Sequence, residues 1–117
     1  AALLQHISKN TSWHVIYLDD QIVMLGKDNQ QNKTLIKEFG MNQQHVTISR
    51  LDKQNGIALA RLANLFIAFG WKEQEEKIES MLLHHPQFAC FALSRIAIVS
   101  TNTSLYQTRL QMQCPAY

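Results

Sequence analysis

The chain has 117 residues, of which 46% are hydrophobic and 17% charged, and its formal net charge is +2. This length fits a single domain over residues 1–117, with the composition of an ordinary globular protein. Because the charge is small and the Lys and Arg residues are scattered, we expect no nucleic-acid partner. No apolar run approaches the roughly 20 residues that span a bilayer.

Residues 1–25 predict a helix followed by strands. Residues 1–9 place apolar side chains on one helical face. Residues 13–18 (WHVIYL) are rich in β-branched and aromatic residues, as is typical of a strand. The pair Asp19-Asp20 either turns the chain into a second strand at 21–25 or lies within one long bent strand over 13–25. The sequence leaves both alternatives open.

The next segment predicts an amphipathic helix. Gly26 ends the preceding strand, and a polar loop supplies Asn32 as the helix N-cap. Leu35, Ile36 and Phe39 form the apolar stripe, and Gly40 follows where a helix ends.

The middle of the chain contains an Asn-Gly pair. Residues 45–52 (HVTISRLD) predict a strand, and Asn55-Gly56 suits a type I′ turn that would pair 45–53 with 57–66. A simple two-residue turn would, however, oppose Arg50 and Arg61. Residues 57–70 stay ambiguous, because Ala and Leu favour a helix whereas the Phe and Ile residues near the end suit a strand.

The last third predicts a helix and two strands. Residues 72–85 predict a helix, because three Glu residues occupy its first turns and Pro86 stops it. Residues 88–99 are apolar throughout, as in a central strand. Residues 105–114 alternate between apolar and polar, which predicts a closing strand after a turn at 101–103.

A weak internal repeat combines these elements into a fold. The step from Leu25-Gly26 through a helix to the strand at Val46 recurs 44 residues later, from Phe69-Gly70 to Cys90. The sequence therefore predicts an α+β, ferredoxin-like β-α-β-β-α-β fold. Its antiparallel sheet would be covered by two helices on one face, with one added terminal hairpin strand.

No residue pattern indicates catalysis. His84-His85 is the one histidine pair, and adjacent helix residues point about 100° apart, so the pair is explained by the helix C-terminus. The Asp19-Asp20 pair is typical of a solvated turn. There is no nucleophile elbow, dinucleotide fingerprint or phosphate-binding loop. We expect no enzyme activity, no cofactor and no metal site.

The two cysteines admit two interpretations. A three-residue turn in the last predicted hairpin would place Cys90 opposite Cys114, within reach of a disulfide, whereas a two-residue turn would point them apart. A disulfide indicates an oxidising compartment such as the periplasm, and free thiols indicate the cytosol.

The second half of the chain resembles a family of bacterial membrane-associated domains. Phe69-Gly70-Trp71, a helix ending in MLLHHPQF, the segment LSRIAIVS and the closing YQTRLQM follow the order of the periplasmic domain of inner-membrane assembly-platform proteins. These are the PilN/PilO-type proteins of type IV pili and the GspL/GspM-type proteins of type II secretion. The resemblance covers roughly residues 57–114.

The resemblance implies a scaffold at the periplasmic face of the inner membrane, without an active site. The domain would pair with itself or with a paralogous platform protein, and residues 1–10 would end a helix descending from an upstream membrane anchor or coiled coil. Pairing would use the closing strand and the surface of helix 72–85. The predicted contact residues are Gln107, Arg109, Gln111, Lys72, Glu76 and Glu79.

Two other classes of function remain as alternatives. Residues 60–87 can form a helix hairpin of a tetratricopeptide-like interaction module, with Gly70 in the turn and Pro86 closing it; this requires 57–69 to be helical. The other alternative is a cytosolic, ligand-sensing ferredoxin-like domain.

Overall fold

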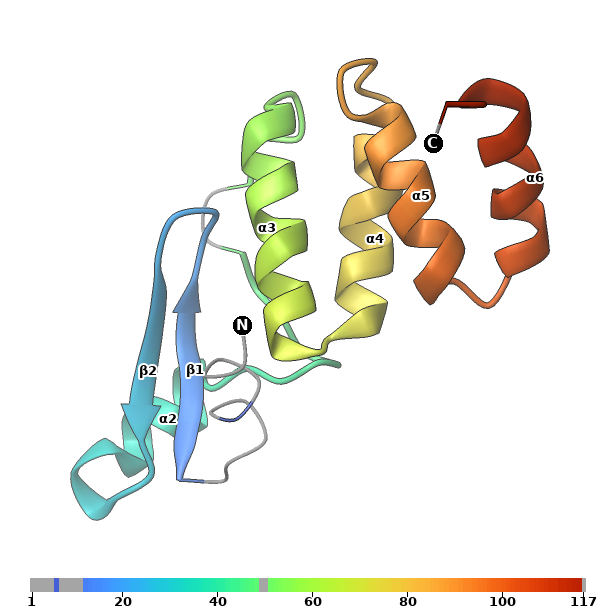
Figure 1. The fold of residues 1–117 in the computed structure, drawn as a ribbon. Helices are drawn as coiled ribbons and strands as arrows, with labels where there is room; N and C mark the ends of the chain where they lie inside the picture. Colours follow the sequence, from blue (N-terminus) through green and yellow to red (C-terminus); the bar gives the residue numbers. More distant parts are fainter. Residues whose placement is uncertain (1–5, 7–11, 49–50, 117) are drawn as a thin grey trace.

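The computed structural model describes residue 6 and residues 12–48 and 51–116, and these form an α+β structure (Figure 1). The helix predicted for residues 1–9 falls almost entirely outside the described residues. The elements in chain order are β1 (Trp13–Leu18), β2 (Val23–Lys27), the 3₁₀ helix η1 (Gln30–Asn32), α2 (Lys33–Phe39), α3 (Gly56–Phe69), α4 (Lys72–Leu82), α5 (Ala89–Val99) and α6 (Thr103–Gln113).

The first two strands form an antiparallel hairpin, so the two-strand alternative is confirmed and the single bent strand is wrong. Asp19 closes the turn between them. Its carboxylate accepts hydrogen bonds from the Gln21 and Ile22 backbone N–H groups, at 2.8 and 2.7 Å, and from the Tyr17 hydroxyl at 2.8 Å. This carboxylate organises the turn, as Asp side chains commonly do.

A bulge in β1 sets which side chains face the core. Val15 pairs with Leu25 and Tyr17 pairs with Met24, so Ile16 is an extra residue in the ladder. Because one extra residue reverses the alternation of faces, Val15 and Leu18 lie on the same side despite their odd spacing. Both are buried.

The segment after β2 returns along the sheet. The predicted helix is confirmed as α2, although Asn32 makes no side-chain cap bond and instead donates its amide to the Lys27 carbonyl at 2.9 Å. Met41 then donates its N–H to the Val15 carbonyl at 2.8 Å. The strand predicted for 45–53 is wrong in its described part, because His45 makes one isolated bridge and residues 46–48 and 51–53 are not in a strand.

Asn55 begins a helix and not a hairpin turn. Its side chain accepts a hydrogen bond from the Ala58 N–H at 3.1 Å, which caps α3. The strand predicted for 57–66 is therefore wrong. The side chains that α3 buries recur at helical spacing, and this spacing outweighs the β propensity of the aromatic residues: they are Ala58, Leu59, Leu62, Ala63, Phe66 and Phe69.

Helix α3 ends in a Schellman motif centred on Gly70. Gly70, at φ 75°, donates its N–H to the Ile67 carbonyl at 3.0 Å, and Trp71 donates to the Phe66 carbonyl at 2.9 Å. The Trp71 ring stacks on Phe69, with 4.8 Å between centroids. The chain therefore reverses at once into α4, as the helix-hairpin alternative requires.

The segments after Pro86 differ most from the prediction. The predicted strands at 88–99 and 105–114 are wrong, because the structure has the helices α5 and α6 there. In α5 the fully buried residues Ala92, Leu93, Ile96 and Ala97 are three or four positions apart, as on one face of a helix. A continuous apolar run does not by itself distinguish a buried strand from a buried helix.

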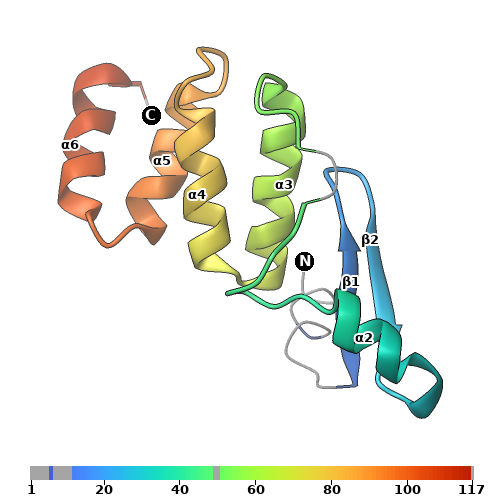
Figure 2. The same cartoon turned by 180° about the vertical axis from the view of Figure 1, so that it is seen from behind.

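The four long helices stand side by side in chain order beyond the hairpin (Figures 1 and 2). α4 lies behind α5 in Figure 1 and in front of it when the molecule is turned. The molecule as a whole is elongated, measuring 54 × 25 × 20 Å, with a radius of gyration of 15.8 Å against about 13 Å expected for a compact domain of this length. Helices therefore pack on helices, as in a solenoid.

The ferredoxin-like arrangement is not present in the described residues. The sheet has two strands, and one set of buried residues joins it directly to the helices. Val15 and Leu18 pack in the same cluster as Leu59 and Leu62 of α3 and Ile78 of α4. Within the described part of the chain, no helix is both long and apolar enough to cross a bilayer.

Candidate functional site

The contact residues predicted on the closing strand lie on α6. Gln107 and Gln111 are exposed and Arg109 is half-buried, with its guanidinium carbon 5.9 Å from the centroid of the Tyr106 ring. In a strand all three would share one face, whereas in a helix Arg109 lies about 200° around the axis from Gln107. The three residues do not form one surface.

The contact residues predicted on α4 also separate. Lys72 is exposed, and half-buried Glu76 accepts a hydrogen bond from the Ser100 hydroxyl at 3.0 Å. Glu79 is fully buried and faces the interior. Its assignment to an outer surface is therefore wrong, because it lies one turn after Glu75 and Glu76 on the side that α5 covers.

The histidine and aspartate pairs have structural surroundings. His85 lies with Nε2 2.9 Å from the Lys53 carbonyl oxygen, and Asp20 lies 3.6 Å from Arg61 of α3. No group of three or more His, Cys, Asp or Glu side chains converges on a metal-sized site within the described residues.

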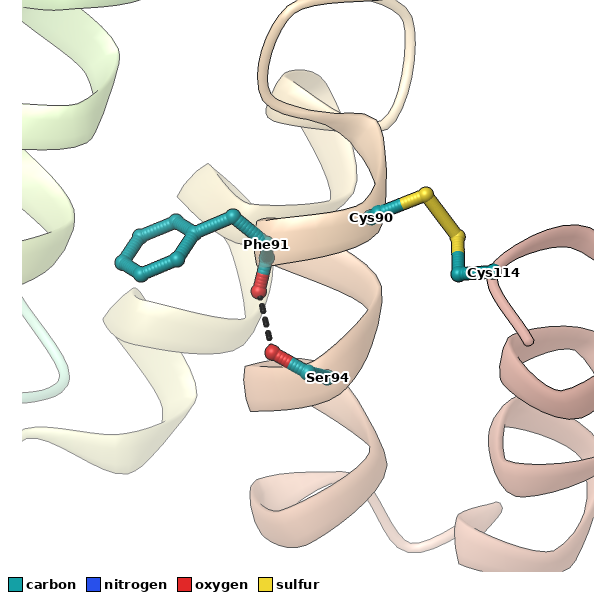
Figure 3. The surroundings of a disulfide bond; sticks show 4 residues. All are labelled: Cys90, Phe91, Ser94 and Cys114. Carbon is teal, nitrogen blue, oxygen red and sulfur yellow. Dashed lines mark hydrogen bonds between the residues drawn. A yellow bond between two sulfur atoms is a disulfide. The ribbon is translucent and has the colours of Figure 1, made fainter. Parts of the chain in front are cut away.

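Cys90 and Cys114 are joined in a disulfide (Figure 3). They lie on helices, at the first turn of α5 and just after α6, and not on opposed strands. α6 is described in full and has no fully buried side chain. The bond therefore fastens a helix whose apolar contact with the buried cluster around Leu93 and Ile96 is made by the half-buried Tyr106 and Leu110.

A polar network lies where α3, α4 and α5 meet. Arg95 of α5 places Nε 3.2 Å from Oε1 of Glu79 and donates from Nη1 to Oδ1 of Asn64 on α3 at 3.0 Å. Its guanidinium carbon lies 4.7 Å from the centre of the Phe91 ring. Neither Glu79 oxygen nor Arg95 Nη2 has a hydrogen-bond partner among the described residues. Glu79 and Arg95 are thus close without meeting in hydrogen-bond geometry.

This incomplete pairing changes the acidity of the buried carboxyls. Burial raises the pKa of Glu79 to about 7; Arg95 opposes the rise and the Glu75 charge adds to it. Burial also raises the pKa of Glu75, against the attraction of Arg95 and Lys72. Near neutral pH, Glu79 is therefore partly protonated, and the Arg95 charge is only partly neutralised.

Exposed apolar side chains surround this network on the open face of α3 and α5. Ile98 is 80% exposed and Ile57 is 56% exposed. Phe91 projects from α5 toward α3 (Figure 3). We call this surface the α3–α5 groove and define it by Ile57, Asn64, Ile67, Phe91, Arg95 and Ile98.

Two hollows lie at the ends of the groove. One, of about 430 Å³, is formed by residues 54–57 and 85–88, near the start of α3. The other, of about 360 Å³, lies near its end and is lined by Ile67, Gly70, Lys72, Glu75, Arg95, Ile98 and Val99. α4 contributes to the second hollow through Lys72 and Glu75, so it forms the floor there.

Sequence reasoning missed this surface. With residues 88–99 interpreted as a central strand, Phe91, Arg95 and Ile98 had no common face. The available signal was Arg95 itself, the one charged residue in the apolar run from 88 to 99. A lone arginine within an apolar segment indicates either a buried partner or a recognition surface.

The groove can bind but has no catalytic arrangement in its described residues. Its polar groups are a guanidinium, an amide and carboxyls at its base, with no nucleophile hydrogen-bonded to a base. Apolar side chains around an arginine are typical of a surface that binds another protein. A scan of family models, a search of curated proteins and a search of solved structures each find no match to this chain.

Proposed function

We propose that this chain is a non-enzymatic protein-interaction module that binds a segment of a partner in the α3–α5 groove. The observation that carries the proposal is the combination of exposed Phe91, Ile67 and Ile98 with Arg95 on one open face. Aromatic residues and Arg are enriched at protein interfaces, and the exposed Ile side chains beside them add apolar area.

The architecture supports this role. Helices stacked in a row leave one side of the stack open, and repeat proteins built in this way bind partners on that side. Here α3 and α5 run in the same direction, and α4 stands next to α3 and behind α5 in Figure 1 (Figures 1 and 2). The open side is therefore framed by two parallel helices of 14 and 11 residues.

The disulfide supports an oxidising compartment. Cys90 and Cys114 are bonded, and such bonds persist in secreted, periplasmic and other extracytosolic proteins. We therefore propose that the module works outside a reducing cytosol.

A place in a pilus or secretion assembly platform stays a prediction from the sequence. Two of the segments that carry the resemblance, LSRIAIVS and YQTRLQM, were predicted to be strands, and the structure has α5 and α6 there. The proposal of an interaction module rests on the helical groove and does not require that machine.

Site-specific photo-crosslinking in the cells that make the protein tests the proposal. A photoreactive phenylalanine analogue at Phe91 reports on the groove, and the same analogue at Met112, a 79% exposed residue of α6, is the control. We expect a discrete crosslinked partner from position 91 and not from position 112. The partner, purified, should bind the wild-type chain with an affinity that groove substitutions reduce.

Two results would overturn the proposal. Crosslinks that form equally from both positions would show that the groove is not a specific contact. If the chain carrying the analogue at position 91 is folded and yet forms no crosslink in intact cells, no partner binds in the groove.

A further inference from the structure

We propose that the α3–α5 groove takes an amphipathic helix whose central Asp or Glu pairs with Arg95, and that Glu79 takes up a proton from solvent when this helix binds. This deepens the proposed function, on which it rests, by naming the chemistry of the partner. The occupant is a helix of another protein, apolar along one face and acidic at its middle.

The charge of the groove indicates that its partner is acidic. α3 carries one charged residue, Arg61, which pairs with Asp20, and α5 carries only Arg95. No Asp or Glu occurs after Glu79 in the whole sequence. The cations of the groove are Lys72, exposed at one end, and Arg95, whose side chain is 14% exposed, whereas the Glu75 and Glu79 carboxyls beneath them are buried. The charge that reaches the surface of the groove is therefore positive and favours a carboxylate.

The dimensions of the groove give the helical form. The two hollows lie near opposite ends of α3, which at 1.5 Å per residue is about 20 Å long. A partner helix of about four turns spans that distance and places apolar side chains in both hollows. Asn64, the ninth of the 14 residues of α3, then lies just past the middle of the partner helix. Arg95 donates to Asn64 and also lines the second hollow, so it lies between that middle and the second hollow.

The buried pair gives the proton linkage. Glu79 is fully buried, and neither of its oxygens makes a hydrogen bond among the described residues, so its ionised form depends on the nearby Arg95 charge. A partner carboxylate that pairs with Arg95 reduces the attraction between Arg95 and ionised Glu79. The neutral form of Glu79 then becomes the more stable one. Above the pKa of the free Glu79 carboxyl, the balance approaches one proton bound from water for each partner carboxylate that pairs, and it falls toward zero below that pKa.

The other groups around Glu79 do not replace Arg95. α4 itself contributes Glu75, whose charge repels that of Glu79, and Lys72 acts on Glu75. α3 contributes Asn64, which is uncharged and already accepts from Arg95. Burial raises the pKa of Glu79 to about 7 although Arg95 opposes the rise, so near neutral pH the ionised and protonated forms of Glu79 have similar stability in the free protein.

Selection from a random displayed library of peptides of about 16 residues tests the partner chemistry. The full oxidised chain is compared with Ile98→Glu and with the matched control Met112→Glu, since the two side chains are 80% and 79% exposed. We expect selected peptides with apolar residues three and four apart around a central Asp or Glu. The same peptides should emerge on Met112→Glu and not on Ile98→Glu.

Each other outcome overturns a distinct claim. Selected peptides with neutral or basic centres that still depend on Ile98 would overturn the acidic partner and leave the proposed function standing. Peptides indifferent to Ile98→Glu would overturn both. Self-association of the wild-type chain that Ile98→Glu abolishes would identify a second copy as the occupant and overturn the proposal.

The affinity of a selected acidic peptide at pH 6 and pH 8 tests the proton. We expect about tenfold tighter binding at pH 6, since binding is coupled to protonation of one group. Glu79→Gln should reduce that ratio below about twofold, whereas Glu73→Gln, an exposed change on the same helix, should preserve it. An unchanged ratio in Glu79→Gln would overturn the role of Glu79.

Discussion

Arg95 Nε lies 3.2 Å from Oε1 of the fully buried Glu79, yet no hydrogen bond to either Glu79 oxygen forms among the described residues. A buried ion pair of this kind gains less from attraction than it loses through removal from water, unless hydrogen bonds complete it. The pair therefore adds little to stability as an ion pair and keeps Arg95 in place on the open face.

This pair predicts that stability falls as the pH rises. Burial raises the folded-state pKa of Glu79 to about 7 from the ordinary 4.5, so the folded chain binds one more proton than the unfolded chain between these values. The free energy of unfolding should decrease from pH 5 to pH 8, by on the order of 3 kcal/mol from this group. Urea unfolding at several pH values measures it.

Two substitutions on α4 identify the group that makes the free energy of unfolding depend on pH. Glu79→Gln, which cannot ionise, should remove most of the decrease, and the exposed Glu73→Gln should leave it intact. A slope that survives Glu79→Gln would show that Glu79 is not the titrating group.

The disulfide predicts a local effect of reduction. It closes a loop of 24 residues, and the loss of such a constraint costs about 3 kcal/mol in chain entropy. Since α6 has no fully buried side chain, we expect reduction to increase hydrogen exchange in residues 103–113 far more than in α3. Comparing the oxidised and reduced wild-type chain avoids any sequence change. Equal protection of α6 in both forms would contradict its dependence on the bond.

Gly70 predicts a backbone effect at the turn between α3 and α4. At φ 75° a side chain is unfavourable, so Gly70→Ala should destabilise the chain by about 1–2 kcal/mol. Gly26→Ala is the control, because a Cβ there would meet its nearest neighbours at 3.4–3.6 Å, which is ordinary contact. Thermal unfolding of the two variants gives the comparison, and equal losses would refute the special role of Gly70.

The sequence predicted the elements whose signals are local. WHVIYL, the acidic start of α4 and Pro86 after its end each indicate one structure from a few residues, and the structure has them. The Asp19-Asp20 pair left a turn and a single bent strand both open, and the structure has the turn. Gly70 also marked a helix end correctly under the helix-hairpin alternative.

The remaining elements depend on packing that no short pattern specifies. Asn55-Gly56 fits a hairpin turn and a helix N-cap equally well, and the buried residues of α3 decide between them. The apolar run in α5 fits a central strand until its packing is known: Ala92 lies in the main buried cluster, and Leu93 and Ile96 lie in a second cluster with Cys114. The α3–α5 groove followed from these helices, so the strand interpretation could not reveal it.

The most direct test of the groove is the dissociation constant of the crosslinked partner for two charge variants. Ile98→Glu places a charge in the groove, and Met112→Glu places the same charge on an equally exposed apolar site of α6. We predict at least tenfold weaker binding for Ile98→Glu and less than twofold change for Met112→Glu, with both variants folded by circular dichroism. Equal affinities for both variants would contradict binding through the α3–α5 groove.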